Sequence, residues 1–192
     1  MAKQLDHLSV AILAVDGFEQ AELEQPRQAL RDAGAQTAIV SAKPGKVQGM
    51  NHDVKADTFD VDQTFDQADP GRYDAVLVPG GVVNADAIRM EEGARRFVQR
   101  MQEAGKPLAV ICHGPWLLVS AGLVKGRTLT SWPSLQDDLR NAGATWTDQE
   151  VVVDGNWVSS RKPDDIPAFN RAFIGLLEQA AGAAGRDRQA AG

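Results

Sequence analysis

Short apolar runs alternate along the chain with segments in which apolar residues recur at helical spacing. The apolar runs have the length and composition of strands that are buried on both faces of a sheet. They lie at 8–15, 36–41, 75–78 and 108–111. Helical spacing is found at 19–33, 92–104 and 166–177. Strands that alternate with helices predict an α/β fold, in which a mainly parallel central sheet has helices on both faces.

Smaller elements are predicted in the second half of the chain. A short strand is expected at 128–131, followed by a helix that Ser134 caps and that ends at Gly143. The dipeptide Asp154-Gly155 separates two β-prone runs. Because this dipeptide suits a tight primed turn, we expect a β-hairpin there.

Four segments depart from the regular pattern. Pro26 lies inside the first helix and is expected to bend or interrupt it. The segment 43–53 has the proline, glycine and asparagine of a loop, and 54–64 is interpreted as a short antiparallel excursion. The tail 182–192 has too few apolar residues to pack and is predicted to be disordered, which leaves one domain at 8–181.

Composition restricts the class of protein. The chain has 192 residues, of which 43% are apolar and 24% charged, as is usual for one globular domain. Its formal net charge of −6 argues against a stable nucleic-acid partner, because nucleic-acid binding needs a basic face. A single cysteine excludes an internal disulfide, and no apolar run is long enough to span a membrane. The first residues lack the features of a signal peptide, so we expect a cytoplasmic protein.

The one cysteine, Cys112, follows the apolar run 108–111 and precedes His113, Gly114 and Pro115. A glycine and a proline at that point predict a sharp turn from a strand into a helix. A thiol there lies at the carboxyl edge of the sheet, near a helix N-terminus that lowers the thiol pKa. His113 is placed to accept the thiol proton. Cys112 is therefore a candidate nucleophile, the alternative being a small buried apolar side chain.

Two other strand ends are expected to meet the cysteine at the same edge of the sheet. Glu19 follows the first strand, and in its protonated form it would hold the thiolate without adding like charge. The alternative for Glu19 is a residue that only favours the first turn of a helix. Gly80 and Gly81 follow the third strand, where their backbone N–H groups either stabilise an oxyanion or merely form a tight turn.

Several segments together resemble the signature motifs of the PfpI-like branch of the ThiJ/PfpI superfamily. They are Phe18-Glu19, Leu77-Val78-Pro79-Gly80-Gly81 and Ile111-Cys112-His113-Gly114-Pro115. Further matches are Thr130-Ser131-Trp132-Pro133, Asp137-Asp138 and the segment Val151–Arg161. The similarity extends from about Val10 to Leu177 and so covers nearly the whole chain.

The resemblance implies a flavodoxin-like α/β sandwich of the class I glutamine amidotransferase-like type, and a homo-oligomer that is a dimer or a hexamer. Glu19 then matches the family glutamate that hydrogen-bonds the thiolate. His113 matches a histidine that an acidic residue of a neighbouring subunit orients, here Asp86; the alternative for Asp86 is a solvated acid at a helix start. The backbone at Gly81, His113 and Gly114 then surrounds an oxyanion.

Members of the superfamily have been described as intracellular cysteine peptidases, glutathione-independent glyoxalases, deglycases of glycated proteins and nucleotides, and general stress proteins. The resemblance therefore implies a stress-protective cysteine hydrolase, of peptidase or deglycase type, that attacks a carbonyl or amide carbon through Cys112. Its substrate would be a small carbonyl compound, a glycated protein or a peptide. The alternative is a redox sensor or protein-protecting protein whose cysteine is oxidised without turnover.

Other kinds of site find less support in the sequence. No cofactor and no metal site are expected, because one cysteine and three scattered histidines give no ligand spacing. A glutamine amidotransferase would need its histidine and acid late in the chain, whereas His7 and His52 both lie early. Trp116 and Trp132 are candidate pocket residues, and the alternative for both is ordinary packing.

Overall fold

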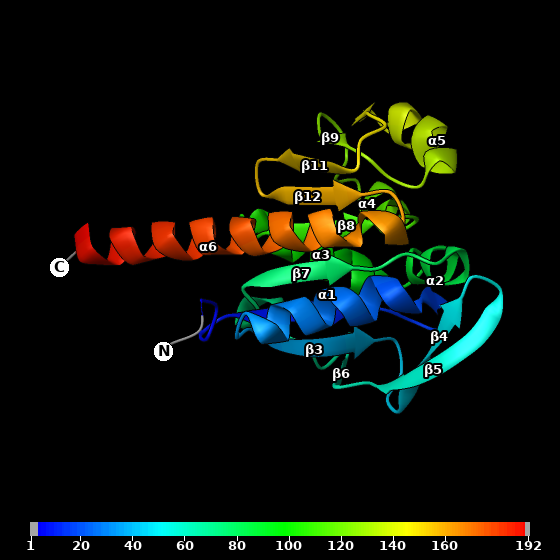
Figure 1. Ribbon diagram of the computed structural model, residues 1–192, viewed down its shortest axis with the longest axis horizontal. Helices are drawn as coiled ribbons and strands as arrows, with labels where there is room; N and C mark the ends of the chain where they lie inside the picture. Colours follow the sequence, from blue (N-terminus) through cyan, green and yellow to red (C-terminus); the bar gives the residue numbers. More distant parts are fainter. Residues whose placement is uncertain (1–3, 191–192) are drawn as a thin grey trace.

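A computed structural model describes residues 4–190, with side chains described for residues 4–183. Its centre is a seven-stranded sheet with the strand order β11-β12-β8-β7-β1-β3-β6 (Figure 1). The strands are β1 (Ser9–Leu13), β3 (Gln36–Ser41), β6 (Gln63–Thr64), β7 (Ala75–Val78), β8 (Leu108–Ile111), β11 (Val151–Asp154) and β12 (Trp157–Ser160). Neighbouring strands pair in parallel, except that β11 and β12 form the predicted antiparallel hairpin. The prediction of a mainly parallel sheet is confirmed.

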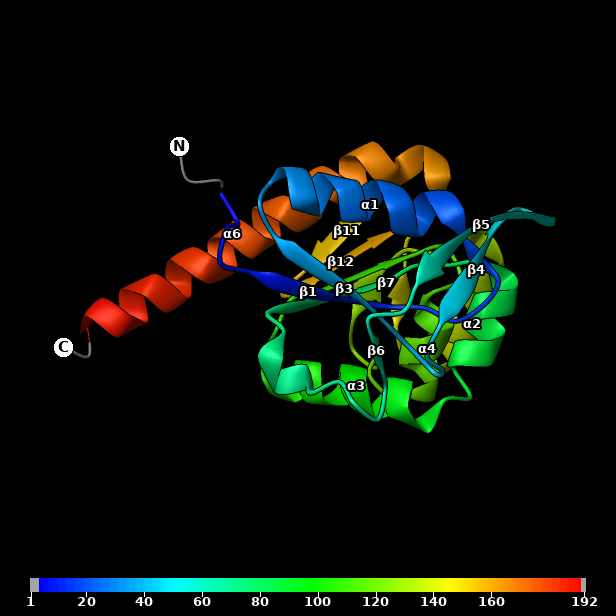
Figure 2. The ribbon, with the colours of Figure 1, turned by 90° about the horizontal axis from the view of Figure 1, so that it is seen from below.

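Helices cover both faces of the main sheet (Figure 2). The helices on these faces include α1 (Gln20–Asp32), α3 (Glu92–Glu103), α4 (Pro115–Ser120) and α6 (Ile166–Ala190). Successive strand residues alternate between two cores: Ile12 belongs to the core beneath α1 and α6, and Leu13 to the core beneath α3 and α4. This two-sided burial is why the strands appear in the sequence as continuous apolar runs. None of the helices within residues 4–190 is long and apolar enough to cross a membrane.

A second sheet of three strands extends from the side of the molecule that carries β3 (Figure 1). It consists of β2 (Phe18–Glu19), β4 (Lys46–Asn51) and β5 (Val54–Asp60). The antiparallel pairing of β4 with β5 confirms the antiparallel excursion predicted over 54–64. The prediction of a loop at 43–53 is wrong, because that segment contains β4. Only Val47 and Gly49 of this strand are buried, so it carries little apolar signal.

The remaining elements are short. They are α2 (Val82–Ile88), α5 (Gln136–Asn141), the strands β9 (Thr128–Leu129) and β10 (Thr145–Trp146), and the 3₁₀ helices η1 (Pro70–Arg72), η2 (Pro133–Leu135) and η3 (Pro163–Asp165). Strand β9 matches the beginning of the strand predicted at 128–131, and it pairs in parallel with β10. Helix α2 was not predicted from the sequence.

Three local predictions differ from the structure. Pro26 does not interrupt α1; its ring is buried on the core side of the helix, and this burial offsets the lost hydrogen bond. Ser134 caps no helix, because the chain enters α5 through the 3₁₀ turn η2 without a side-chain cap. Helix α6 continues through 182–190, predicted to be disordered, where alanine, arginine and glutamine favour helix. Residues 191–192 of the predicted tail lie outside the described residues.

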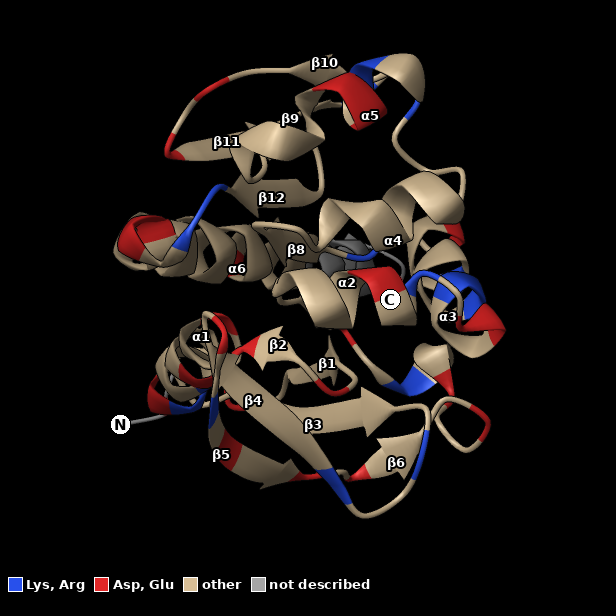
Figure 3. Cartoon of the chain, turned by 90° about the vertical axis from the view of Figure 1, so that its right-hand side faces the viewer, with Lys and Arg blue, Asp and Glu red and all other residues tan. Residues whose placement is uncertain are grey.

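The parallel sheet brings several strand ends to one edge of the molecule. Strands β1, β7 and β8 are neighbours in register, so their carboxyl ends lie side by side. Figure 3 views the molecule from this edge, with α2 and α4 in front of the sheet. In an open parallel sheet this edge is where ligands bind.

Candidate active site

Cys112 lies where β8 ends and α4 begins, as the sequence predicts. Its φ of +61° is in the left-handed region that residues other than glycine rarely adopt. The turn is held on two sides: the Cys112 N–H donates to the Ser160 carbonyl at 3.1 Å, and the Cys112 carbonyl accepts from Trp132 N at 2.9 Å. The Gly114 N–H donates to the carbonyl of Ile111 at 3.0 Å. These bonds fix the cysteine at the carboxyl edge of the sheet.

Glycine lets the end of β7 approach the cysteine closely. A Cβ atom on Gly80 would lie 2.5 Å from Glu22 Oε2 and 2.6 Å from the Cys112 Cβ, closer than real Cβ atoms pack. Gly81 has a φ of +84°, and a Cβ on it would collide with the backbone of Gly17. Side chains at these two positions would therefore separate the groups that surround the sulfur.

The carboxyl beside the sulfur belongs to Glu22 and not, as predicted, to Glu19. Glu22 is fully buried on the core face of α1, and its Oε2 accepts the N–H of Gly80 at 2.8 Å. A hydrogen bond also links the Glu22 side chain to Cys112. Glu19 precedes the helix, in β2, and its Oε2 accepts the backbone N–H of His52 at 3.0 Å. The pairing of β2 with β4 turns Glu19 toward the β4–β5 hairpin.

His113 is buried next to Cys112, and its Nδ1 lies 3.2 Å from the Cys112 Sγ. The imidazole stacks on the Trp132 ring, with centroids 5.8 Å apart, and meets the edge of Trp116 at 5.4 Å. Burial lowers the pKa of His113 to about 4, so the imidazole is neutral at neutral pH and is able to accept a proton. Asp86 is exposed on α2. Its contact with the histidine of a neighbouring subunit stays a prediction.

Burial also controls the ionisation of the pair Cys112 and Glu22. It raises the pKa of Glu22 to about 8, against the opposing effect of the Gly80 N–H. Glu22 is therefore protonated at neutral pH and adds no like charge to the sulfur. Burial raises the pKa of the Cys112 thiol as well, although the N–H groups of Gly81 and His113 act to lower it. Burial of the thiol therefore opposes the lowering of its pKa that the sequence predicts.

Only some of the backbone N–H groups near the sulfur are free to stabilise an oxyanion. Gly80 donates to the buried carboxyl and Gly114 donates to the end of β8, so neither N–H stabilises an oxyanion as predicted. The N–H groups of Gly81 and His113 are directed at the Cys112 sulfur. They lie where negative charge on the sulfur, or on an oxygen next to it, would develop.

A cavity of about 390 Å³ opens onto Cys112. His113, Glu22 and Gly81 line it around the sulfur, and Trp132 forms another part of the wall. Trp132 thus occupies the predicted position. Trp116 packs against the imidazole and does not line this cavity, and its indole N–H donates to a carboxylate of α5 at 2.8 Å.

Besides Glu22, four lining residues of this cavity were not predicted from the sequence, and two of them, Val82 and Pro163, are apolar. The other two are polar. They are His52 and Asp53, which form the turn between β4 and β5. His52 has a φ of +56°, in the left-handed region. The position of His52 early in the chain gave no sign of this role, because only the folding back of the hairpin brings it to the cavity.

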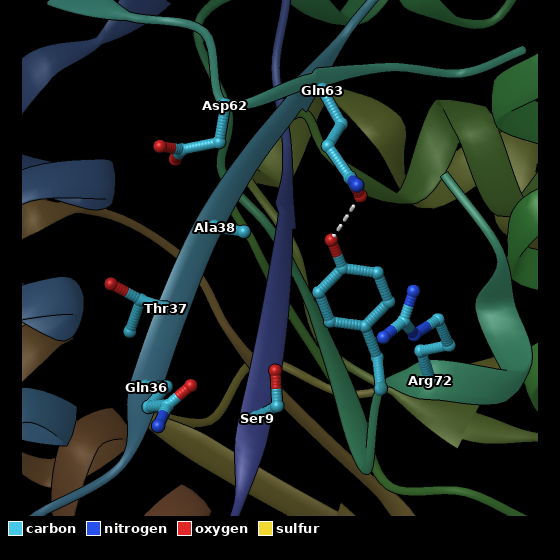
Figure 4. Close-up of a pocket in the computed structure, with 8 residues that line it drawn as sticks. Ser9, Gln36, Thr37, Ala38, Asp62, Gln63 and Arg72 are labelled. Atoms are coloured by element: carbon cyan, nitrogen blue, oxygen red, sulfur yellow. Dashed lines mark hydrogen bonds between the residues drawn. The ribbon is translucent and has the colours of Figure 1, made fainter. Parts of the chain in front are cut away.

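A larger cavity, of about 500 Å³, lies elsewhere (Figure 4). It is lined by Ser9 and Gln36, at the amino ends of β1 and β3, and by Tyr73, whose hydroxyl donates to Gln63 Oε1 at 2.7 Å. Its lining contains neither cysteine nor histidine. Within residues 4–183, no group of three His, Cys, Asp or Glu side chains is placed to hold a metal ion. The cavity at the cysteine is therefore the candidate active site.

Comparison with known proteins assigns the chain to a family. The model of the DJ-1/PfpI family matches residues 8–176. The chain belongs to the DJ-1/PfpI family. It is 45% identical over 170 residues to the deglycase TK1284 of Thermococcus kodakarensis, an alignment that covers 88% of this chain and 99% of that protein. It is 39% identical over 170 residues to the protein/nucleic acid deglycase 2 of Escherichia coli, covering 88% of this chain and 96% of that protein.

A solved structure supports the fold of this DJ-1/PfpI protein. The chain superimposes, with a TM-score of 0.83 and 33% identity, on a two-domain protein of Anabaena variabilis that contains DJ-1/ThiJ/PfpI-like and ferritin-like domains. The superposition covers 88% of this chain and 48% of that one, so this chain spans about half the length of that protein. The predicted α/β fold and the PfpI-like branch of the family are confirmed.

In this DJ-1/PfpI protein only part of the predicted site comes together. Cys112, His113 and the backbone of Gly81 surround one sulfur atom. Glu19 lies in the wall of the cavity, and Asp86 lies on the exposed side of α2. The carboxyl next to the sulfur comes from Glu22 of α1, about one helical turn beyond the predicted Glu19.

Proposed function

We propose that this protein is a deglycase, a cysteine hydrolase that releases an amine from its adduct with a small 2-oxoaldehyde. The main support is the arrangement at Cys112, where the thiol, a neutral imidazole 3.2 Å away and a protonated carboxyl share one cavity. Two relatives that bear the name deglycase belong to the same family. A cavity of about 390 Å³ is at the small end of ligand sites and suits a small adduct better than an extended peptide.

In the proposed reaction the Cys112 thiol gives its proton to His113, and the sulfur forms a bond to the carbon that carries the amine. The carbon–nitrogen bond breaks, and the amine leaves with a proton, so that a hemithioacetal remains. A proton then moves from this carbon to the adjacent carbonyl carbon by way of His113, while the hydroxyl proton on the first carbon passes to the neighbouring oxygen. The product is a thioester. Water hydrolyses the thioester to a 2-hydroxy acid and restores the thiol. One carbon is oxidised while its neighbour is reduced, so no external oxidant or reductant is needed.

The other groups around the sulfur have distinct tasks in this proposal. The N–H groups of Gly81 and His113 stabilise negative charge on the substrate oxygen, a role in which one donor is worth about 100- to 1000-fold in rate. Protonated Glu22 holds the sulfur in position while adding no charge of its own. The same sulfur, if oxidised instead of turned over, would serve the redox role.

The proposal is tested with the methylglyoxal adduct of N-acetylarginine amide. We expect the wild-type protein to release N-acetylarginine amide and lactate in equal amounts, and Cys112→Ser to release neither above background. Ser134→Ala, at an exposed position outside the cavity, is the matched control and keeps full activity. Circular dichroism establishes that both variants are folded.

Three outcomes would contradict a deglycase. Lactate formed from free methylglyoxal at the rate seen with the adduct identifies a glyoxalase. Cleavage of unmodified peptides without turnover of the adduct identifies a peptidase. Stoichiometric oxidation of Cys112 by peroxide, without turnover of any of these substrates, identifies the redox alternative.

A further inference from the structure

We infer that the cavity at Cys112 selects adducts on cationic groups, such as the guanidinium of arginine, over adducts on phosphate-bearing nucleotides. This inference rests on the proposed deglycase function, which leaves the amine component open. Its basis is the part of the cavity wall formed by Glu19, His52 and Asp53, called the hairpin wall below.

The hairpin wall is a built part of the fold. Strand β2 pairs in parallel with β4, and the carboxylate of Glu19 accepts the backbone N–H of His52 at 3.0 Å. This bond joins the segment before α1 to the turn between β4 and β5, although the two are 33 residues apart. It keeps Glu19, and the turn that carries Asp53, at the same cavity as the sulfur.

The described lining of this cavity includes no lysine or arginine. Around the sulfur, His113 is neutral because burial lowers its pKa to about 4, and Glu22 is protonated because burial raises its pKa to about 8. The Oε1 atom of Glu22 is buried and has no nitrogen or oxygen partner among the described residues. The fixed charge of the cavity therefore comes from Glu19 and Asp53 and is negative.

Two cations lie beyond Trp132, in a neighbouring cavity of about 310 Å³. Arg161 contacts Asp165 and Asp148, each at 2.9 Å, so that its charge is matched by carboxylates of its own chain. Lys162 lies 3.6 Å from a carboxylate two residues further on. Both cations are already paired with carboxylates, and neither lines the cavity at the sulfur. They therefore do not offset the negative charge of the hairpin wall.

The sign of the charge decides which adducts are favoured. An arginine adduct that keeps its positive charge is attracted by the two carboxylates of the hairpin wall, whereas a nucleotide phosphate is repelled by them. Even at the dielectric constant of bulk water, one unit charge about 4 Å away changes the local concentration of a singly charged molecule by about fivefold. The effect reverses with the sign of that molecule and weakens as salt is added.

The single cysteine allows a direct measurement that does not depend on turnover. Two methanethiosulfonate reagents share one reactive group, but 2-(trimethylammonio)ethyl carries a positive charge and 2-sulfonatoethyl a negative one. The ratio of their rate constants with Cys112, followed by mass spectrometry at low salt, cancels the fraction of thiolate. We expect the wild-type ratio to exceed that of N-acetylcysteine amide, a neutral reference thiol, by more than tenfold.

Variants of the hairpin wall identify the source of the effect. We expect Glu19→Gln and Asp53→Asn each to lower the ratio about fivefold or more. Glutamine at position 19 still has an oxygen that accepts the His52 N–H, so the wall is kept. Asp60→Asn removes one negative charge at the other end of the same hairpin, where it pairs with Lys46 at 3.1 Å, and should change the ratio less than twofold.

The same variants are then compared on the two kinds of adduct. With methylglyoxal adducts of N-acetylarginine amide and of guanosine monophosphate, we expect the wild-type kcat/KM to favour the arginine adduct, and Glu19→Gln and Asp53→Asn to reduce that preference. Equal turnover of both adducts, or a reagent ratio that neither variant changes, overturns the inference alone. Turnover of neither adduct overturns the proposed function, even where the reagent ratio still reports a negative cavity.

Discussion

Replacing Glu22 by glutamine removes one proton-binding group from the interior of the folded protein. Burial raises the pKa of this carboxyl from 4.5 to about 8. Between these two values the folded chain holds a proton that the unfolded chain has lost, so a rise in pH favours unfolding. The stability that the protonated carboxyl contributes is fully present below pH 4.5 and is lost as the pH rises toward 8.

The raised pKa of Glu22 determines how much the free energy of unfolding changes with pH. Each pH unit inside this window lowers the free energy of unfolding by about 1.4 kcal/mol, which amounts to about 2 kcal/mol between pH 6.5 and pH 8. The range begins at pH 6.5 because of His113, whose pKa burial lowers from 6.5 to about 4. That group destabilises the fold only as the pH falls below 6.5, so it does not contribute within the range. The raised pKa of Cys112 acts at higher pH still.

Urea unfolding followed by circular dichroism checks this prediction at four pH values in that range, with ionic strength and protein concentration held fixed. The wild-type free energy of unfolding should fall by about 2 kcal/mol relative to that of Glu22→Gln. The amide oxygen can still accept the Gly80 N–H, so the variant keeps the local structure. Glu24→Gln, on the exposed side of the same helix, should follow the wild type. A constant difference between wild type and Glu22→Gln across the four values refutes the reasoning from burial.

Two further predictions concern the groups packed around the sulfur. Gly80→Ala places a methyl group 2.5 Å from Glu22 Oε2 and 2.6 Å from the Cys112 Cβ, and should lower stability by about 1–3 kcal/mol. Thermal unfolding measures the loss, and Gly182→Ala, at an open position, should show none. Iodoacetamide should alkylate Cys112 with a pH midpoint above the ordinary value of about 8.5, because burial raises the thiol pKa. Mass spectrometry follows that reaction, and a midpoint near pH 7 contradicts the stated direction.

The main sheet was predictable because its strands are buried on both faces and leave continuous apolar runs in the sequence. The strand β4 left no such run. It has only Val47 and Gly49 buried, and it exists because it pairs with β2 and β5. The local sequence pattern does not show pairing between distant segments, so strand β4 and the cavity residues at its turn, His52 and Asp53, were not predicted.

The cysteine and its turn were predictable from neighbouring residues, whereas the identity of the carboxyl was not. Glu19 and Glu22 are both close to the start of α1, and one turn of helix separates them. The sequence does hold a signal, since Glu22 shares the buried face of the helix with Pro26 and Leu30. A carboxyl placed among core positions is itself a sign of a functional site.

At position 112 the requirements of reactivity and of stability conflict. A side chain held at a φ of +61° costs about 1–2 kcal/mol relative to glycine, and the protein accepts that cost at its only cysteine. A chain that loses the sulfur to glycine there would shed this strain together with its reactivity. Laboratory evolution toward heat resistance alone would therefore drift toward inactive proteins, and only a screen that also scores turnover would keep the thiol.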